Sequence, residues 1–174
     1  MKKLFFVSFF SVFFSFFFFL SIKMSVSCLI LCDNGDSNSC LRAITAAKVL
    51  GESVRVSFLA PEKFSQRLNQ FGDVVSVPDS VYSKCELAAT AAKETIDKMK
   101  PSHVIGPATV FGKCVVPYLS TKYGCSTVSD VTKILSSNTF ERTTGDGSMV
   151  ETIKVKSKQD GRFVYSIKKS VFLC

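Results

Sequence analysis

The stretch that decides the fold begins with HVIG (103–106) and continues into a turn and helix that carry FGK (111–113). A short apolar run that ends in a glycine-bearing turn and enters a helix is typical of a buried strand in a parallel sheet. Two polar motifs follow, SDV (129–131) and FERT (140–143). In an open α/β sheet, ligands and partners gather at the carboxyl ends of the strands. We therefore expect these motifs to share one functional edge.

Apolar runs alternate with helical patterns on the N-terminal side of this stretch. Strands are expected at 26–32, 54–59, 74–77 and 103–106, and helices at 37–50, 62–69, 84–99 and 109–123. Ser37 or Ser39 is expected to cap the first helix, and Pro117 is expected to kink or shorten the last one. Leu87, Ala91, Thr95 and Met99 are expected to share one side of the 84–99 helix.

The pattern changes after Cys125. Four β-rich segments follow without helices between them, at 127–134, 139–144, 150–156 and 163–167. Turn residues separate the segments. Taken with three preceding βα units, they predict an α/β fold, in which a three-layer, mostly parallel sheet is finished by antiparallel strands.

The first 23 residues stand apart from this globular pattern. Lys2 and Lys3 precede an apolar, phenylalanine-rich run over 4–20. Such a leader is typical of a secretory signal or a membrane anchor, and about 17 residues is the lower limit for crossing a bilayer. A mitochondrial transit peptide would instead be rich in arginine, which this segment lacks. A third interpretation is a wrongly assigned start, with translation beginning at Met24. The folded domain is expected to occupy 24–174.

The net charge of +8 falls to +5 without Lys2, Lys3 and Lys23 of the leader. Much of the remaining positive charge lies near the C-terminus, in Lys154, Lys156, Lys158, Arg162, Lys168 and Lys169. A basic run of this kind can contact nucleic acid or an anionic membrane. No nucleic-acid-binding motif accompanies it, so we interpret it as the solvated face of a late hairpin. Nucleic acid is not an expected partner, and a membrane is one only if the leader is retained.

The seven cysteines are odd in number and irregular in spacing. We interpret most of them as small buried hydrophobes in a reducing compartment, which conflicts with a secretory leader. One histidine and the absence of a Cys-x-x-Cys pair argue against a metal site. His103 is expected to be structural, and no neighbouring histidine completes a triad with Ser129 and Asp130. No catalytic residue and no metal ligand is predicted.

Two turns that enter helices have both a binding and a structural interpretation. The loop 32–39 could hold an anion at a helix start, but Asp33 and Asp36 would repel a phosphate, which favours an ordinary capping turn. In the second turn, Gly112 permits a close backbone approach and Lys113 could reach an anion or a carboxylate. Composition alone favours helix packing at Gly112 and a solvated lysine beside it.

Several motifs in constant order resemble the N-terminal domain of the electron transfer flavoprotein alpha subunit family. They are ITAA (44–47) with LG (50–51), the A-x-x-FGK turn (108–113), Pro117, the SD pair (129–130), and FERT (140–143) with Gly147. The similarity extends over roughly 26–172. The FAD-binding second domain of the family would begin where this chain ends, so only the N-terminal domain is expected here.

The resemblance implies a Rossmann-like fold of the adenine nucleotide alpha hydrolase type and a heterodimer of alpha and beta subunits. The family carries electrons on FAD from acyl-CoA and related dehydrogenases of fatty acid β-oxidation to a membrane quinone oxidoreductase. The resemblance also implies the mitochondrial matrix. This chain would be a non-enzymatic scaffold half, whose partners are the beta subunit and a separate FAD-binding domain. No cofactor is expected for this chain alone, because most of the FAD site belongs to the second domain.

The residues that the resemblance places on an intersubunit or interdomain surface are Phe111, Gly112, Lys113, Ser129, Asp130, Arg142 and Gly147. Arg142 is expected to pair with a carboxylate, because its planar guanidinium suits such contacts. Loss of one partner from a desolvated pair costs about 3–5 kcal/mol. Two alternatives remain open: a stand-alone nucleotide-binding module of the same fold, and a membrane-anchored interaction protein.

Overall fold

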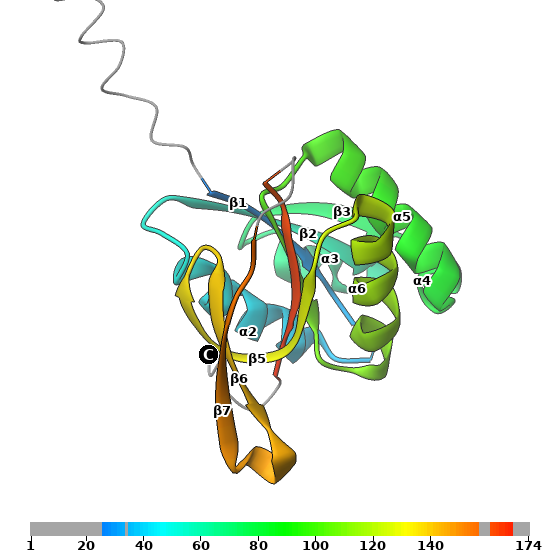
Figure 1. The fold of residues 1–174 in the computed structure, drawn as a ribbon. Coiled ribbons are helices and arrows are strands. Elements are labelled where there is room, and N and C mark those ends of the chain that lie inside the picture. Colours follow the sequence, from blue (N-terminus) through cyan, green and yellow to red (C-terminus); the bar gives the residue numbers. More distant parts are fainter. Residues whose placement is uncertain (1–25, 34, 157–160, 169–174) are drawn as a thin grey trace, which may run out of the picture.

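The computed structural model describes residues 26–33, 35–156 and 161–168, which form an eight-stranded sheet with helices on both faces (Figure 1). The strand order is β3-β2-β1-β4-β8-β5-β6-β7. The strands are β1 (Val26–Leu31), β2 (Val54–Pro61), β3 (Asp73–Val77), β4 (His103–Pro107), β5 (Thr127–Ser136), β6 (Thr139–Thr144), β7 (Met149–Lys154) and β8 (Phe163–Ile167). The helices are α2 (Ser37–Lys48), α3 (Glu62–Leu68), α4 (Asp79–Tyr82), α5 (Cys85–Met99) and α6 (Val110–Tyr123), and a 3-10 turn, η1, covers Gly145–Gly147.

Two apolar cores lie on opposite faces of the sheet and define the three layers. One core joins α2 and α3 to the sheet through residues such as Ile44 and Leu68. The other joins α4, α5 and α6 to the opposite face through residues such as Ala92 and Leu119. Alternate side chains of β1 enter the two cores, as Ile30 and Leu31 do, which explains its continuous apolar run. The predicted α/β fold with a mostly parallel sheet is confirmed.

The last strand corrects the predicted connectivity. β8 does not close an antiparallel tail but runs parallel between β4 and β5. Antiparallel pairing is found only between β5 and β6 and between β6 and β7 within the described residues. β6 is therefore the only described strand that opposes the rest, and the β6–β7 hairpin projects from the body (Figure 1). Four βα units precede this region, where three were expected.

Several helix details differ from the sequence-based expectation. Asp36, and neither expected serine, caps α2 by accepting a hydrogen bond from the backbone N–H of Asn38. α6 continues through Pro117 to Tyr123, so the expected shortening is wrong. α4 is a single turn that the sequence pattern did not reveal.

The buried face of α5 matches the expected side only in part. Thr95 is buried as expected, but Leu87 and Met99 are exposed, and the other buried residues are Ala88, Ala89, Ala92 and Ile96. The small alanine side chains allow α5 to pack closely on its neighbours, so the alanine face is the one that the core selects.

The cysteines are the clearest correction among single residues. Disulfides join Cys32 to Cys40 and Cys85 to Cys114, so four of the six described cysteines are not merely small buried hydrophobes. The two Cα–Cα distances, 5.4 Å and 6.6 Å, fall within the usual range for a disulfide. The pairing depends on the fold, because neither pair is recognisable from its spacing.

The basic C-terminal run does not form one hairpin face. Lys154 is exposed on β7, whereas the Arg162 guanidinium lies 4.5 Å from the centre of the Tyr123 ring and its Nε donates to the Pro101 carbonyl. Lys168 donates to the Thr143 hydroxyl instead of facing solvent with the others. Lys158 and Lys169 lie outside the described residues, as does the leader 1–23. No helix in the described part of the chain has the length and apolar character needed to cross a membrane.

Candidate functional site

The turn between β4 and α6 is fixed by close packing at Gly112. Thr109 caps α6 by accepting from the Gly112 N–H at 3.4 Å. A Cβ at Gly112 would lie 1.7 Å from the Pro107 carbonyl oxygen, so only glycine fits. The close backbone approach expected at this position is therefore made to the end of β4 of the same chain.

Phe111 and Lys113 point in different directions from this turn. The Phe111 ring stacks on Tyr82 with centroids 5.1 Å apart. The buried Tyr82 hydroxyl lies 2.6 Å from the Cys32 carbonyl oxygen and 2.9 Å from that of Leu59, and burial raises the pKa of this phenol. Phe111 thus braces the carboxyl ends of β1 and β2, whereas Lys113 is exposed.

The SD motif lies in an irregularity of β5 beside the carboxyl end of β8. The register between the strands shifts between Val128 and Val131, and Asp130 takes a left-handed backbone conformation with φ 55°. Its N–H is bound by the Ser166 hydroxyl of β8 at 3.1 Å. Aspartate tolerates this conformation better than most residues, so the residue type suits the position. The irregularity takes Ser129 and Asp130 out of the regular β5–β8 pairing.

Arg142 connects this irregularity to the hairpin. Its Nε donates to the Glu151 carboxylate at 3.0 Å, and its Nη1 lies 3.4 Å from the Ser129 hydroxyl. Arg142 and Glu151 face each other in the β6–β7 register. Their side chains are 32% and 46% exposed, so this is a surface pair and not a desolvated one. Such pairs contribute about 0–1 kcal/mol to stability.

Backbone and side-chain contacts of β8 hold these pieces at one edge. The Ala108 N–H donates to the Ile167 carbonyl at 3.0 Å, and the Lys168 N–H donates to the Val131 carbonyl at 2.9 Å. The Lys168 Nζ donates to the Thr143 hydroxyl at 3.0 Å. We use the name edge cluster for Ser129, Asp130, Arg142, Thr143, Glu151 and Lys168.

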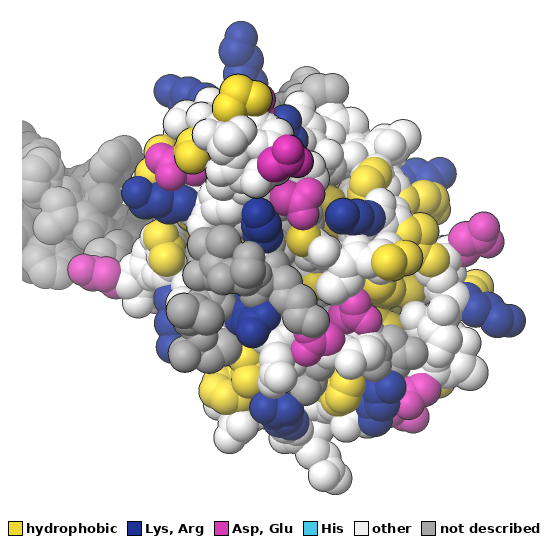
Figure 2. Space-filling model, turned by 90° about the horizontal axis from the view of Figure 1, so that it is seen from below, with side chains coloured by type: hydrophobic (Ala, Val, Ile, Leu, Met, Phe, Trp, Pro, Cys, Tyr) yellow, Lys and Arg dark blue, Asp and Glu magenta, His cyan; other side chains and the backbone are white. Residues whose placement is uncertain are grey.

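The structure brings some of the predicted surface residues together and separates others. Ser129, Asp130 and Arg142 meet in the edge cluster, and the α6 start with Gly112 adjoins it through Ala108. Gly147 lies in η1 at the tip of the β6–β7 hairpin, with φ 87°, and a Cβ added there would meet no other atom within 4 Å. Figure 2, seen from the end where the parallel strands finish, shows charges of both signs interspersed with hydrophobic side chains.

The described residues at this edge do not fit the phosphates of a flavin or adenine nucleotide. A Cβ at Gly106 would meet Val116 at 2.5 Å, and one at Gly112 would meet the Pro107 carbonyl, so protein atoms already fill the space beside both glycines. At the start of α2, Asp33 accepts from the Gly35 N–H and Asp36 from the Asn38 N–H. These carboxylates occupy the position that a phosphate would need. No step of electron transfer is assigned to these residues.

His103 lies away from the edge cluster, at the opposite end of β4. It is buried, with Nδ1 3.1 Å from the Ser102 hydroxyl and Nε2 3.0 Å from the Ser137 carbonyl oxygen, and it stacks on Phe163. Burial lowers the pKa of the imidazole, and the hydrogen bond to Ser137 opposes this. Both ring nitrogens are engaged in packing strands together. No group of three or more potential metal ligands occurs within the described ranges.

Sequence reasoning missed Glu151, Ser166 and Lys168 as members of this edge. Glu151 was within reach of prediction, since a hairpin closed by the turn at 145–147 places it opposite Arg142. Ser166 and Lys168 were not, because their positions depend on the insertion of β8 between β4 and β5.

A layered, mostly parallel sheet with polar groups gathered at one carboxyl edge defines this molecule as an open-sheet α/β domain. A family model described as the electron transfer flavoprotein domain matches residues 32–172. Because the match covers most of the chain, the protein belongs to the electron transfer flavoprotein family.

Individual relatives agree with this assignment. The chain is 28% identical over 135 residues to the electron transfer flavoprotein subunit alpha of Paracoccus denitrificans, covering 75% of this chain and 43% of that protein. It is 26% identical over 148 residues to the mitochondrial alpha subunit of Dictyostelium discoideum, covering 76% and 42% respectively. A probable mitochondrial alpha subunit of Caenorhabditis elegans is 30% identical over 121 residues, covering 66% and 36%. The chain thus spans about two fifths of the curated relatives it matches, which confirms the resemblance to the N-terminal domain of alpha subunits.

Proposed function

We propose that this chain acts by assembly, as the scaffold half of an alpha-type subunit in a heterodimeric electron carrier. The observation that carries the proposal is the edge cluster, where family-matched residues from β5 and β6 meet beside the start of α6. The exposed Arg142–Glu151 pair, together with the exposed Lys113 on the adjoining α6, suits recognition of a polar protein surface.

In this account the partner is a beta-type subunit, and a separate domain holds the FAD. The carrier would accept electrons from acyl-CoA and related dehydrogenases of fatty acid β-oxidation in the mitochondrial matrix. When bound to the complex, FAD supplies the redox chemistry. The residues of this chain orient the neighbouring domains and perform no bond-making step.

Binding to the beta-type subunit of the same genome tests the proposal through Arg142. Isothermal titration calorimetry should give a 1:1 complex with the full chain. Arg142→Met should raise the Kd by about tenfold or more, as expected for a charged residue at an interface. Lys93→Met is the matched control, because it removes another exposed ion pair, Lys93–Asp97, on α5. The control should leave the Kd within about twofold.

Two results would contradict the proposal. One is the absence of any complex with the beta-type subunit. The other is an equal loss of affinity in Arg142→Met and Lys93→Met. Stoichiometric binding of AMP to the isolated chain would instead favour the stand-alone nucleotide-binding module, although Asp33 and Asp36 stand where its phosphate would lie.

A further inference from the structure

The two disulfides among the described residues differ sharply in their access to solvent. Cys32 and Cys40 are 0% and 1% exposed and belong to the core beneath α2. Cys114 is exposed on α6 and Cys85 is half-buried at the start of α5. Since thiol–disulfide exchange requires an in-line approach of a thiolate to a sulfur, only the Cys85–Cys114 bond can be reached without opening the fold.

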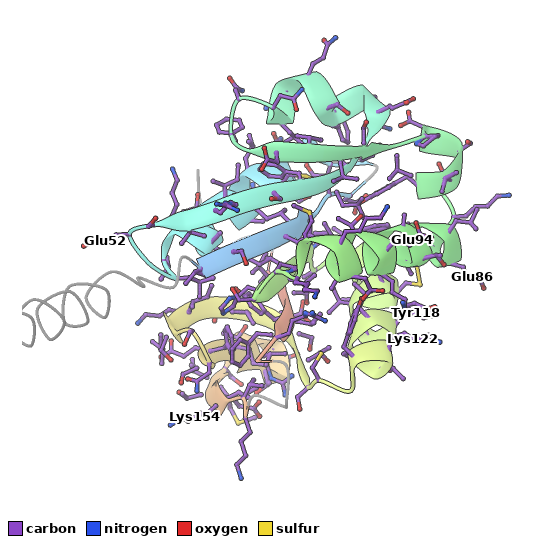
Figure 3. All side chains as sticks on the ribbon, turned by 90° about the horizontal axis from the view of Figure 1, so that it is seen from above. Glu52, Glu86, Glu94, Tyr118, Lys122 and Lys154 are labelled. Carbon is purple, nitrogen blue, oxygen red and sulfur yellow. A yellow bond between two sulfur atoms is a disulfide. The ribbon has the colours of Figure 1, made fainter. Side chains whose placement is uncertain are left out.

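The surroundings of the exposed bond also favour its cleavage. Cys85 is the first residue of the 15-residue helix α5, where backbone N–H groups and the helix dipole stabilise a thiolate. Lys84 and Lys113 adjoin the two cysteines in sequence, and both are exposed, as is Glu86, which follows Cys85 and carries the opposite charge. Figure 3 shows Glu86 at this end of α5 and directed outward. The helix start and the two adjacent lysines therefore favour Cys85 as the leaving group.

We infer that the Cys85–Cys114 disulfide is a surface site of reversible thiol–disulfide exchange with low-molecular-weight thiols such as glutathione. The thiolate of one small thiol attacks the exposed Cys114 sulfur, forms a mixed disulfide there, and releases the Cys85 thiolate. A second small thiol attacks the mixed disulfide and releases the Cys114 thiolate. The protein disulfide gains two electrons and two protons, and the two small thiols lose them and leave as one small disulfide. Oxidation by the small disulfide reverses each step.

The bond connects the exchange chemistry to the packing of two helices. It joins the start of α5 to the turn of α6 that follows Phe111 and Gly112, and the Cys85 sulfur lies 4.0 Å from the Phe111 carbonyl oxygen. Reduction removes this covalent link and leaves the buried Cys32–Cys40 bond in place. The inference is independent of the proposed assembly role, since it depends only on the exposure and position of the four sulfurs.

The test is differential alkylation of the oxidised, full-length chain under native conditions, resolved peptide by peptide by mass spectrometry. With reduced glutathione added, Cys85 and Cys114 should become alkylated together. They should react at least about tenfold faster than Cys32 and Cys40, because burial keeps glutathione from reaching the Cys32–Cys40 bond. Quenching early should trap glutathione on Cys114. Cys28 is an internal reference for intact folding, since it is buried and desolvation raises its pKa to about 12.

Matched double variants complete the experiment. Cys85→Ser with Cys114→Ser should abolish the fast phase, and Cys32→Ala with Cys40→Ala should retain it. The inference is overturned if both disulfides open at the same rate in the native protein, if the Cys32–Cys40 bond opens first, or if protein equilibrated with oxidised glutathione contains no Cys85–Cys114 bond. The wild-type measurement decides among these results even if a variant fails to fold.

Discussion

Single residues at the carboxyl edge are held by contacts between side chains and backbone of the same domain. Tyr82 binds the ends of β1 and β2 through one hydroxyl, and Phe111 stacks on its ring. Gly112 brings the start of α6 against the end of β4. These contacts fix the backbone at the carboxyl edge. The Arg142 side chain is partly exposed there, and Lys113 is exposed.

Gly112→Ala should destabilise the protein by about 1–3 kcal/mol or more, since the new methyl group would overlap the Pro107 carbonyl and neither backbone segment can move freely. Urea denaturation followed by circular dichroism measures the loss. Gly35→Ala is the control, because its Cβ would meet only Asp33 Oδ1 at 3.7 Å. The control should change the stability by less than about 0.5 kcal/mol. Equal effects of the two substitutions would refute the close approach at Gly112.

His103 should make the stability depend on pH in the mildly acidic range. Nε2 must carry its proton to bind the Ser137 carbonyl, so the second proton would have to enter at the buried Nδ1. Burial lowers the pKa in the folded state, whereas the unfolded imidazole titrates near about 6.5. The unfolded state therefore binds more protons as the pH falls, and stability is lost below about pH 6.5 by up to about 1.4 kcal/mol per pH unit.

Urea melts between about pH 7.5 and 5 measure this slope. The wild type should lose stability steadily toward the acidic end of the range. His103→Gln should flatten the slope, because it removes the titrating group at that position. A wild-type slope as flat as that of His103→Gln would show that the imidazole does not stay neutral in the folded protein.

Among the helices, α5 ends at a residue that is poorly suited to its conformation. Lys100 takes a left-handed conformation with φ 48° and ψ 51°, and its N–H donates to the Ile96 carbonyl. Lys100→Gly should stabilise the protein by about 1 kcal/mol, because glycine adopts this conformation without steric cost. Lys98→Gly, one residue before the end of the helix, should instead destabilise by up to about 1 kcal/mol. Thermal melts of both variants check the opposite signs.

Local patterns revealed most elements but not their arrangement. The bounds 139–144 and 163–167 agree with β6 and β8, because alternating and apolar runs are local signals. The position of β8 between β4 and β5 is a choice among distant partners, which periodicity does not encode. The inward face of α5 was missed for a related reason: Leu87 is more hydrophobic than alanine, but close packing selected the alanines.

The sequence likewise revealed the motifs of the candidate site but not all of their partners. SD and FERT were recognised as motifs, but they meet because β5 and β6 pair in antiparallel orientation, with Val131 opposite Arg142. The partners Glu151 and Ser166 come from β7 and β8, and only the three-dimensional register places them beside Arg142 and Asp130. The disulfides were the least predictable from the sequence. Cys85 and Cys114 are joined only because α5 and α6 pack together.

At the scale of the whole molecule, the described chain is a layered body with a projecting hairpin and an edge of mixed charge (Figures 1 and 2). Figure 3 shows Glu94, Tyr118 and Lys122 on the α5–α6 side, apart from Lys154 on the hairpin side. The face shown in Figure 2 carries charges of both signs and is not the single-sign patch that favours nucleic acid. This shape suits a domain that docks between other protein surfaces.

The most direct test of the account is size-exclusion chromatography with light scattering, recorded at both protein and flavin absorbance. The account predicts that the purified chain alone elutes without flavin and forms a 1:1 complex with the beta-type subunit. A chain that elutes yellow by itself, or one that forms no complex with the beta-type subunit, would contradict the claim that this domain docks while the flavin is held elsewhere.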